Sequence, residues 1–193
     1  MASPPPARPH ALVIPFPAQG HVIPLMEVAH ALADRGVAVT FVNTEFNHGR
    51  VVAAMPSPPR RNGVTENGGS GKLGMGRNRI RLVAVPDGME PDEDRNNLVR
   101  LTVLMQEHMA PPVEELIRRS GEEEAAVDGD GDGWGRITCV VADYNVGTWA
   151  LDVARRTGVM SAAVWPASAA VVASLLSIPK LVRDKVIDAQ DGK

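Results

Sequence analysis

A turn between an apolar run and an amphipathic segment constrains this chain most. Residues 11–16 are almost wholly apolar, and the run stops at a Pro-Ala-Gln-Gly turn. From residue 22 onward the apolar side chains recur at helical spacing and end at Gly36, and a second, β-branched run covers 37–42. A strand, a helix and a strand in this order predict a β-α-β unit with two parallel strands and a right-handed crossover.

The rest of the chain continues this alternation. We predict further strands at 80–85, 137–142 and 159–165, helices at 96–109, 111–121, 146–157 and 167–177, and a short helix within 43–55. Five strands alternating with helices indicate an α/β fold, a Rossmann-like, doubly wound, mostly parallel sheet.

Length and composition favour one domain without a nucleic acid or membrane partner. The 193 residues are 44% hydrophobic, and we place the domain at 10–179, between an N-terminal tail at 1–9 and a C-terminal tail at 180–193. The net charge of −3 is not gathered into basic blocks, so neither a nucleic acid nor a membrane surface is expected. The single cysteine, Cys139, has no internal disulfide partner, and we expect a cytoplasmic protein.

Two segments rich in small and polar residues predict disordered loops, at 56–79 and 122–135. The second begins with the spacing of a calcium loop, Asp128-x-Asp130-x-Asp132. The twelfth position of that loop is Cys139 instead of a bidentate glutamate, and it belongs to the next strand. We therefore expect a linker here, with no metal and no cofactor.

A methionine stripe in the predicted helix at 96–109 allows two interpretations. Met105 and Met109 share one helical face with Leu98 and Leu101. Such stripes usually pack in a core, but flexible methionines also line adaptable substrate pockets. Both interpretations stay open from the sequence.

His21 and Asp143 form the best candidate catalytic pair. Two phosphate-binding motifs are excluded first. The turn at 17–20 lacks the three spaced glycines of a dinucleotide-binding site, and Gly71-Lys72 is not accompanied by the other residues of a P-loop. His21 opens the first helix and Asp143 follows the fourth strand, and in the strand order 3-2-1-4-5 these two positions face each other. A carboxylate that holds one imidazole nitrogen leaves the other as a general base, although such pairs are more often structural.

Several stretches resemble the N-terminal half of plant UDP-dependent glycosyltransferases. They are HALVIPFPAQGHVIPLM at 10–26, VTFVNTEFNH at 39–48, VPDG at 85–88, CVVAD at 139–143, WALDVA at 149–154, VWPASA at 164–169 and IPKL at 178–181. The resemblance implies the N-terminal, acceptor-binding lobe of a GT-B architecture, in which a facing lobe holds the UDP-sugar.

The resemblance also implies roles for individual residues. His21 matches the general base that deprotonates an acceptor hydroxyl, with inversion at the sugar, and Asp143 matches its carboxylate partner. The turn residues Gln19 and Gly20 are candidate substrate contacts, as are Met105 and Met109 under the pocket interpretation. Trp165, Pro166 and Ser168 match the loop that reaches toward the sugar; many relatives carry threonine where Pro166 stands, and proline offers no hydroxyl.

The donor-binding signature of the C-terminal lobe has no counterpart in this sequence, so we expect one lobe that is inactive by itself. Two hypotheses follow. The chain is the acceptor half of an enzyme that transfers a sugar, with glucose as the first choice, to a flavonoid, phenolic, terpenoid or hormone. Alternatively, it is a non-catalytic remnant that binds a small molecule or a protein. Affinity for UDP-glucose would separate the two.

Overall fold

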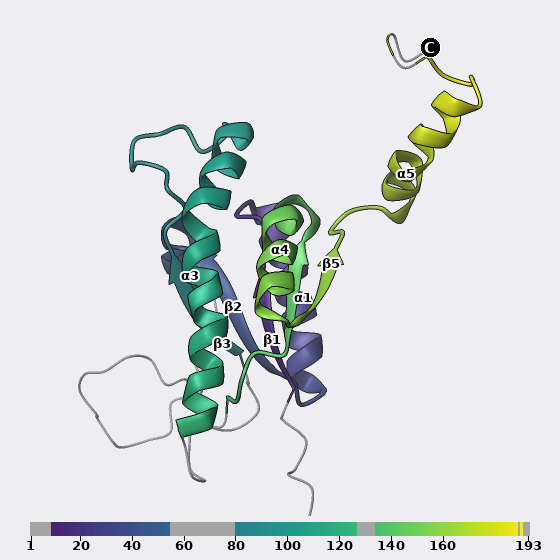
Figure 1. Ribbon diagram of the computed structural model, residues 1–193. Coiled ribbons are helices and arrows are strands. Elements are labelled where there is room, and N and C mark those ends of the chain that lie inside the picture. The colour runs from purple at the N-terminus through teal and green to yellow at the C-terminus, as the bar shows by residue number, and fades with distance from the viewer. Residues whose placement is uncertain (1–8, 55–79, 127–133, 189, 191–193) are drawn as a thin grey trace, which may run out of the picture.

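The protein folds into a five-stranded parallel sheet with helices on both faces. The computed structural model describes residues 9–54, 80–126, 134–188 and 190. The strand order is β3-β2-β1-β4-β5, and every pair of neighbours is parallel (Figure 1). This order and the α/β fold confirm the prediction. The strands are β1 (His10–Ile14), β2 (Ala38–Thr44), β3 (Ile80–Val85), β4 (Cys139–Asp143) and β5 (Met160–Val164).

The helices connect these strands in chain order. They are α1 (Gln19–Asp34), α2 (Glu45–Ala54), α3 (Leu98–Ala126), α4 (Gly147–Thr157) and α5 (Ala169–Arg183), with one 3₁₀ turn, η1 (Tyr144–Val146). The short helix expected within 43–55 is therefore present as α2. The expected loops at 56–79 and 122–135 lie largely outside the described residues, although α3 extends into the second of them.

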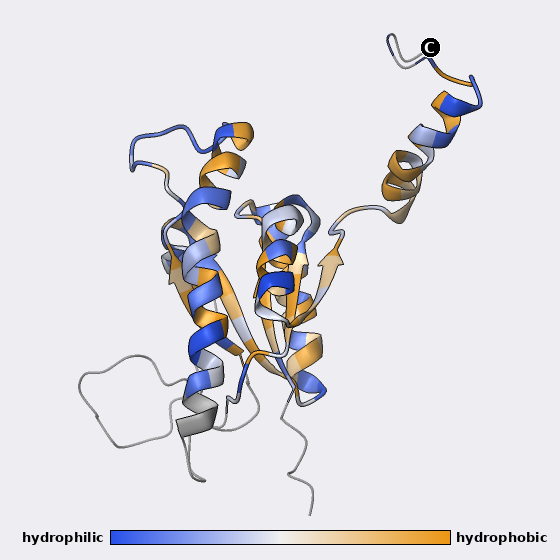
Figure 2. Ribbon diagram, in the orientation of Figure 1, coloured by the Kyte–Doolittle hydropathy of each residue, from blue (hydrophilic) through white to orange (hydrophobic). Residues whose placement is uncertain are grey.

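Each face of the sheet has its own apolar core, because successive strand residues point to opposite faces. Leu12, Ile14 and Val140 pack on the face covered by α3 and α4, whereas Val13 and Phe41 pack on the face covered by α1. Strands β1 and β2 are buried along their whole length, as expected for parallel strands covered on both sides. Figure 2 shows that the strands of the sheet are largely hydrophobic. Cys139 packs beside the second core, and burial raises the pKa of its thiol.

Helix α3 corrects the prediction of two helices, one at 96–109 and one at 111–121 that starts with Pro111-Pro112. It runs without interruption from Leu98 to Ala126 and includes both prolines. Its apolar stripe has four-residue spacing through Met105, Met109, Val113 and Ile117, all buried in the core under α3 and α4. Packing on both sides of the prolines holds the helix together at a place where local propensity would end it.

Other helix boundaries also differ from the prediction. Helix α1 begins at Gln19, so His21 is the third residue of its first turn and does not open it. Helix α5 continues through Pro179 to Arg183, where we expected an end before the proline. The proline removes a hydrogen bond to the Leu175 carbonyl, and water can replace that bond because Leu175 is exposed.

Among the described residues, no helix is both long and apolar enough to cross a lipid bilayer.

The continuous α3 stripe predicts that Met109 contributes strongly to stability. Met109 is 1% exposed, and its truncation in Met109→Ala should lower the free energy of unfolding by about 2–5 kcal/mol, since a cavity is left in the core. Urea denaturation followed by circular dichroism measures this. Val103→Ala, on the solvent side of the same helix, is the control and should change stability by less than about 0.5 kcal/mol. Similar losses in the two variants would contradict the packing described here.

Candidate active site

His21 and Asp143 meet at the carboxyl edge of the sheet. The imidazole Nδ1 of His21 lies 2.8 Å from Oδ2 of Asp143, although the residues are 122 positions apart in the chain. Pairing of β1 with β4 places the two side chains together, since parallel strands end at the same edge. The sequence-based prediction of this pair is therefore matched by its geometry.

Asp143 is fixed in position by the turn that follows it. Its carboxylate is fully buried, and Oδ1 accepts a hydrogen bond of 2.9 Å from the backbone N–H of Asn145 in η1. The other oxygen contacts His21. One oxygen thus anchors the carboxylate to the backbone, and the other orients the imidazole.

His21 is partly exposed and has a defined tautomer. A carboxylate only accepts hydrogen bonds, so Nδ1 of His21 carries a proton and donates a hydrogen bond to Asp143. In the neutral imidazole this leaves the lone pair on Nε2. The side chain is 28% exposed, and the ring of Phe16 packs edge-on against it with centroids 5.3 Å apart. No side chain caps the start of α1, and the backbone N–H groups of His21 and Val22 donate to the Ala18 carbonyl. This arrangement suits a general base.

A groove of about 970 Å³ opens beside the first turn of α1. It runs from the β1–α1 turn across α1 and α2 to the beginning of α3. Much of its wall is apolar, from Val22, Ile23, Met26, Phe46, Leu98 and Leu101. Gln19 lines the groove, whereas His21 and Asp143 are not among its lining residues. Gly20 lies open, since an added Cβ would meet nothing within 4 Å.

Polar contacts hold the groove walls together. The side chain of Asn47 in α2 donates a 2.7 Å hydrogen bond to the Pro17 carbonyl. Arg95 forms an ion pair of 2.5 Å with the buried Asp87, and its guanidinium lies 4.0 Å from the centre of the Phe46 ring. These contacts tie the segments that follow β1, β2 and β3 to one another.

Sequence reasoning missed Phe46 and Arg95 as groove residues. Both follow the carboxyl ends of strands, and these strands lie on the same side of β1. Their positions just after two strands were the only indication in the sequence that they lie near the site. That both side chains belong to one wall of the groove depends on where α2 and the β3–α3 segment lie, and the sequence does not give this.

The structure corrects the pocket interpretation of Met105 and Met109. These side chains are 0% and 1% exposed, pack in the core under α3 and α4, and do not line the groove. Their helix carries the stripe that faces the sheet, so the core interpretation holds.

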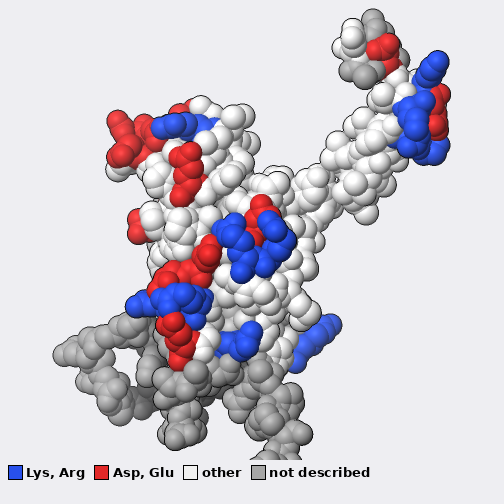
Figure 3. All heavy atoms as spheres, in the orientation of Figure 1, with Lys and Arg blue, Asp and Glu red and all other residues white. Residues whose placement is uncertain are grey.

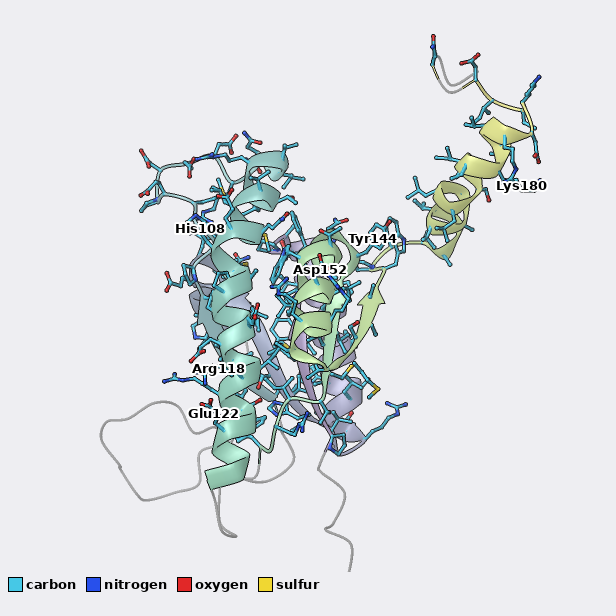
Figure 4. All side chains as sticks on the ribbon, in the orientation of Figure 1. His108, Arg118, Glu122, Tyr144, Asp152 and Lys180 are labelled. Carbon is cyan, nitrogen blue, oxygen red and sulfur yellow. The ribbon has the colours of Figure 1, made fainter. Side chains whose placement is uncertain are left out.

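The residues after β5 lie on the other side of the Asp143 strand from the groove. The indole N–H of Trp165 donates to the Ser168 carbonyl at 3.2 Å, and the Ser168 hydroxyl caps α5 by accepting from the backbone N–H of Ala170. Tyr144, which the sequence did not single out, packs edge-on against Trp165 with ring centroids 5.0 Å apart and is 54% exposed (Figure 4). We call Tyr144 and Trp165 the aromatic rim. Tyr144 follows Asp143 directly in the chain, and Pro166 follows Trp165.

Comparison with known proteins shows what this chain is similar to. No family model matches the chain. It is 40% identical to UDP-glycosyltransferase 83A1 of Arabidopsis thaliana over 186 residues, which is 96% of this chain and 36% of that protein. It is 31% identical to (R)-mandelonitrile beta-glucosyltransferase of Prunus dulcis over 188 residues, 96% of this chain and 34% of that protein. The chain matches the N-terminal portion of plant UDP-glycosyltransferases. It spans about a third of the length of these relatives.

Solved structures of plant UDP-glycosyltransferases have the same fold. Os79 from O. sativa in complex with UDP superposes with a TM-score of 0.60 at 23% identity, over 94% of this chain and 37% of that one. Arabidopsis thaliana UGT89C1 complexed with UDP gives a TM-score of 0.58 at 18% identity, over 83% of this chain and 37% of that one. The sheet thus has the Rossmann-like fold of the corresponding part of these proteins.

The buried carboxylate predicts a tautomer switch in Asp143→Asn. The asparagine amide can donate to Nδ1 of His21, which moves the imidazole proton to Nε2 and removes the free lone pair from the exposed nitrogen. Nitrogen chemical shifts of ¹⁵N-labelled histidine should show protonated Nδ1 in the natural chain and protonated Nε2 in the variant. Thermal melting should shift little, because size and packing are conserved. An unfolded variant, or an unchanged tautomer, would contradict this assignment.

Proposed function

We propose that this chain is the acceptor-binding half of a UDP-glycosyltransferase that transfers a sugar, with glucose as the first choice, from a UDP-sugar to a small lipophilic alcohol or phenol. The observation that carries the proposal is the contact of 2.8 Å between His21 and the buried Asp143, beside a largely apolar groove. The activity of the two curated relatives described above supports sugar transfer.

The reaction starts with proton transfer to His21. Nε2 accepts the proton of an acceptor hydroxyl while the oxygen attacks the anomeric carbon of the sugar. The bond from that carbon to the UDP oxygen breaks, and UDP leaves with the electron pair. A single displacement inverts the configuration at that carbon. Asp143 stabilises the imidazolium as it forms, and the step needs no metal ion.

The acceptor approaches His21 from the groove. Apolar walls favour a lipophilic ring system, and the groove wall includes Gln19, two residues before the base in the chain. Flavonoids, phenolics, terpenoids and hormones with a free hydroxyl have this character. The solved structure of UGT89C1 complexed with quercetin, at 17% identity, illustrates one such ligand in a protein of the same fold.

The sugar approaches from the opposite side of the base, over the ends of β4 and β5. The aromatic rim of Tyr144 and Trp165 lies there, and Pro166 and Ser168 follow it. Aromatic faces suit the C–H groups of a pyranose ring. The Ser168 hydroxyl already caps α5, so its contribution to a sugar contact is secondary. In this proposal the UDP moiety is bound by a C-terminal lobe that lies outside this chain.

Removal of the base tests the proposal. We join this chain to the C-terminal part of UDP-glycosyltransferase 83A1 and measure glucoside formation from UDP-glucose with a panel of phenolic and alcohol acceptors. His21→Ala should lower turnover by about 10²-fold or more, the usual contribution of a positioned base. The control, His108→Ala, changes a histidine in α3 outside the pair and should retain turnover. Equal turnover in the two variants would remove His21 from this role.

Obstruction of the groove tests its assignment to the acceptor. Leu98 lines the groove and is 52% exposed, and Leu98→Trp should fill part of it. We expect the KM for the acceptor to rise about tenfold, with a much smaller change in the KM for UDP-glucose. Val99→Trp adds the same ring at the next residue, which is 77% exposed and outside the groove, and should leave both constants unchanged. An unchanged acceptor KM in Leu98→Trp would place the acceptor elsewhere.

A further inference from the structure

Arg95 is held inside the groove wall, unlike the other arginines that form ion pairs in the described part of the chain. Its Nη1 lies 2.5 Å from Oδ2 of Asp87, and the two side chains are 20% and 5% exposed. In the remaining arginine–carboxylate pairs of that part, the arginine side chain is at least 49% exposed. Exposed pairs contribute little, whereas a buried pair is costly to break. Asp87 and Arg95 therefore hold a defined position in the wall.

The turn after β3 places Asp87 beside Arg95. Oδ1 of Asp87 accepts a hydrogen bond of 3.0 Å from the backbone N–H of Met89, which leaves Oδ2 for the guanidinium. Gly88, between them in the chain, has a φ of 79°, a left-handed conformation that favours glycine. The motif VPDG at 85–88, to which the proposed reaction assigns no role, thus supplies the carboxylate that holds Arg95.

Arg95 in turn contacts the ring of Phe46 from a different segment of the chain. Its guanidinium carbon lies 4.0 Å from the centre of that ring, and Phe46 lines the groove and is 47% exposed. Arg50 also approaches the ring, at 5.2 Å, but it belongs to α2 like Phe46 and moves with it. The contact with Arg95, and not that with Arg50, can therefore fix the ring relative to the end of β3.

Helix α2 depends on such contacts because its side chains lie outside the two apolar cores. None of its described side chains belongs to either core. Its first turn is tied by Asn47, which donates from its side chain to the Pro17 carbonyl and from its backbone N–H to the Thr44 hydroxyl. These bonds connect α2 to the ends of β1 and β2. The stacking of Arg95 on Phe46 adds a connection to the segment after β3.

We propose that Arg95, held by Asp87, is a positioning residue that keeps Phe46 in the groove wall and thereby sets the affinity for the acceptor. The identity of the ligand as an acceptor rests on the proposed function, whereas the positioning of Phe46 is a property of this chain alone. Arginine suits this task because its planar guanidinium can bond a carboxylate at its edge while an aromatic ring stacks on its face. Lysine offers a point charge that can pair with Asp87 but cannot stack in this way.

Amide hydrogen exchange of the 193-residue chain tests the positioning without any turnover. Arg95→Lys keeps a positive charge opposite Asp87, so the chain should fold, but it loses the stacking on Phe46. Amides of α2 should then exchange at least about fivefold faster, while those of α1 stay unchanged. Arg100→Lys makes the same substitution in the exposed pair with Glu93 and should exchange like the natural chain. Unchanged exchange in α2, or equal acceleration in α1 and α2, would overturn the proposal.

Steady-state kinetics of the chain joined to the C-terminal part of UDP-glycosyltransferase 83A1 tests the effect on the acceptor. Arg95→Lys and Phe46→Leu should each raise the acceptor KM about fivefold, with kcat and the KM for UDP-glucose nearly unchanged. The double variant should be no worse than the stronger single variant, because the two residues act through one contact. Phe46→Tyr keeps the aromatic ring and should retain the natural acceptor KM.

The kinetic outcomes separate this positioning role from a failure of the proposed function. An unchanged acceptor KM in Arg95→Lys, an equal loss of kcat, or additive effects in the double variant would overturn the proposal. A joined chain that forms no glucoside even with its natural residues would contradict the proposed function. In that case the exchange rates of α2 decide the positioning of Phe46 by themselves.

Discussion

The pairing of β1 with β4 is the constraint on which the rest of this structure depends. β1 lies at the centre of the sheet, with β2 on one side and β4 on the other, and its register aligns Ile14 with Ala142. The chains leaving these two strands therefore start next to each other. His21 and Asp143 are brought into contact by this alignment, and no local feature of either segment could do so alone.

The same strand order divides the approach to His21 into two sides. The segments after β2 and β3 build the groove, with Phe46 and Arg95 in its wall. The segments after β4 and β5 build the aromatic rim of Tyr144 and Trp165. Under the proposed function, the acceptor comes from the groove side and the sugar from the rim side. The displacement itself requires that the attacking oxygen, the anomeric carbon and the leaving UDP oxygen lie on one line. Charged side chains also gather on the face formed by α3 and α4, where Arg156 and Glu114 join the two helices at 2.7 Å (Figure 3).

The helices show where local sequence signals and tertiary packing disagree. Pro111 and Pro112 predict a break, yet α3 continues because Met109 and Val113 on either side are held in the core. Pro179 predicts an end, yet α5 continues because its exposed carbonyls can bind water. The methionines of α3 illustrate a related limit: their spacing defines a face, but not whether that face meets the core or a pocket.

The sequence by itself determined the alternation of strands and helices, the placement of His21 and Asp143 at segment ends, and the family motifs that link them to sugar transfer. These features are local, since hydrophobic periodicity and turn residues act over a few positions of the chain. Only the tertiary structure decided that the two side chains touch, that α2 and Arg95 line the groove, and that Met105 and Met109 do not. Each of these depends on which elements pack together across long stretches of chain, and burial and contact over such separations are not encoded at any single position.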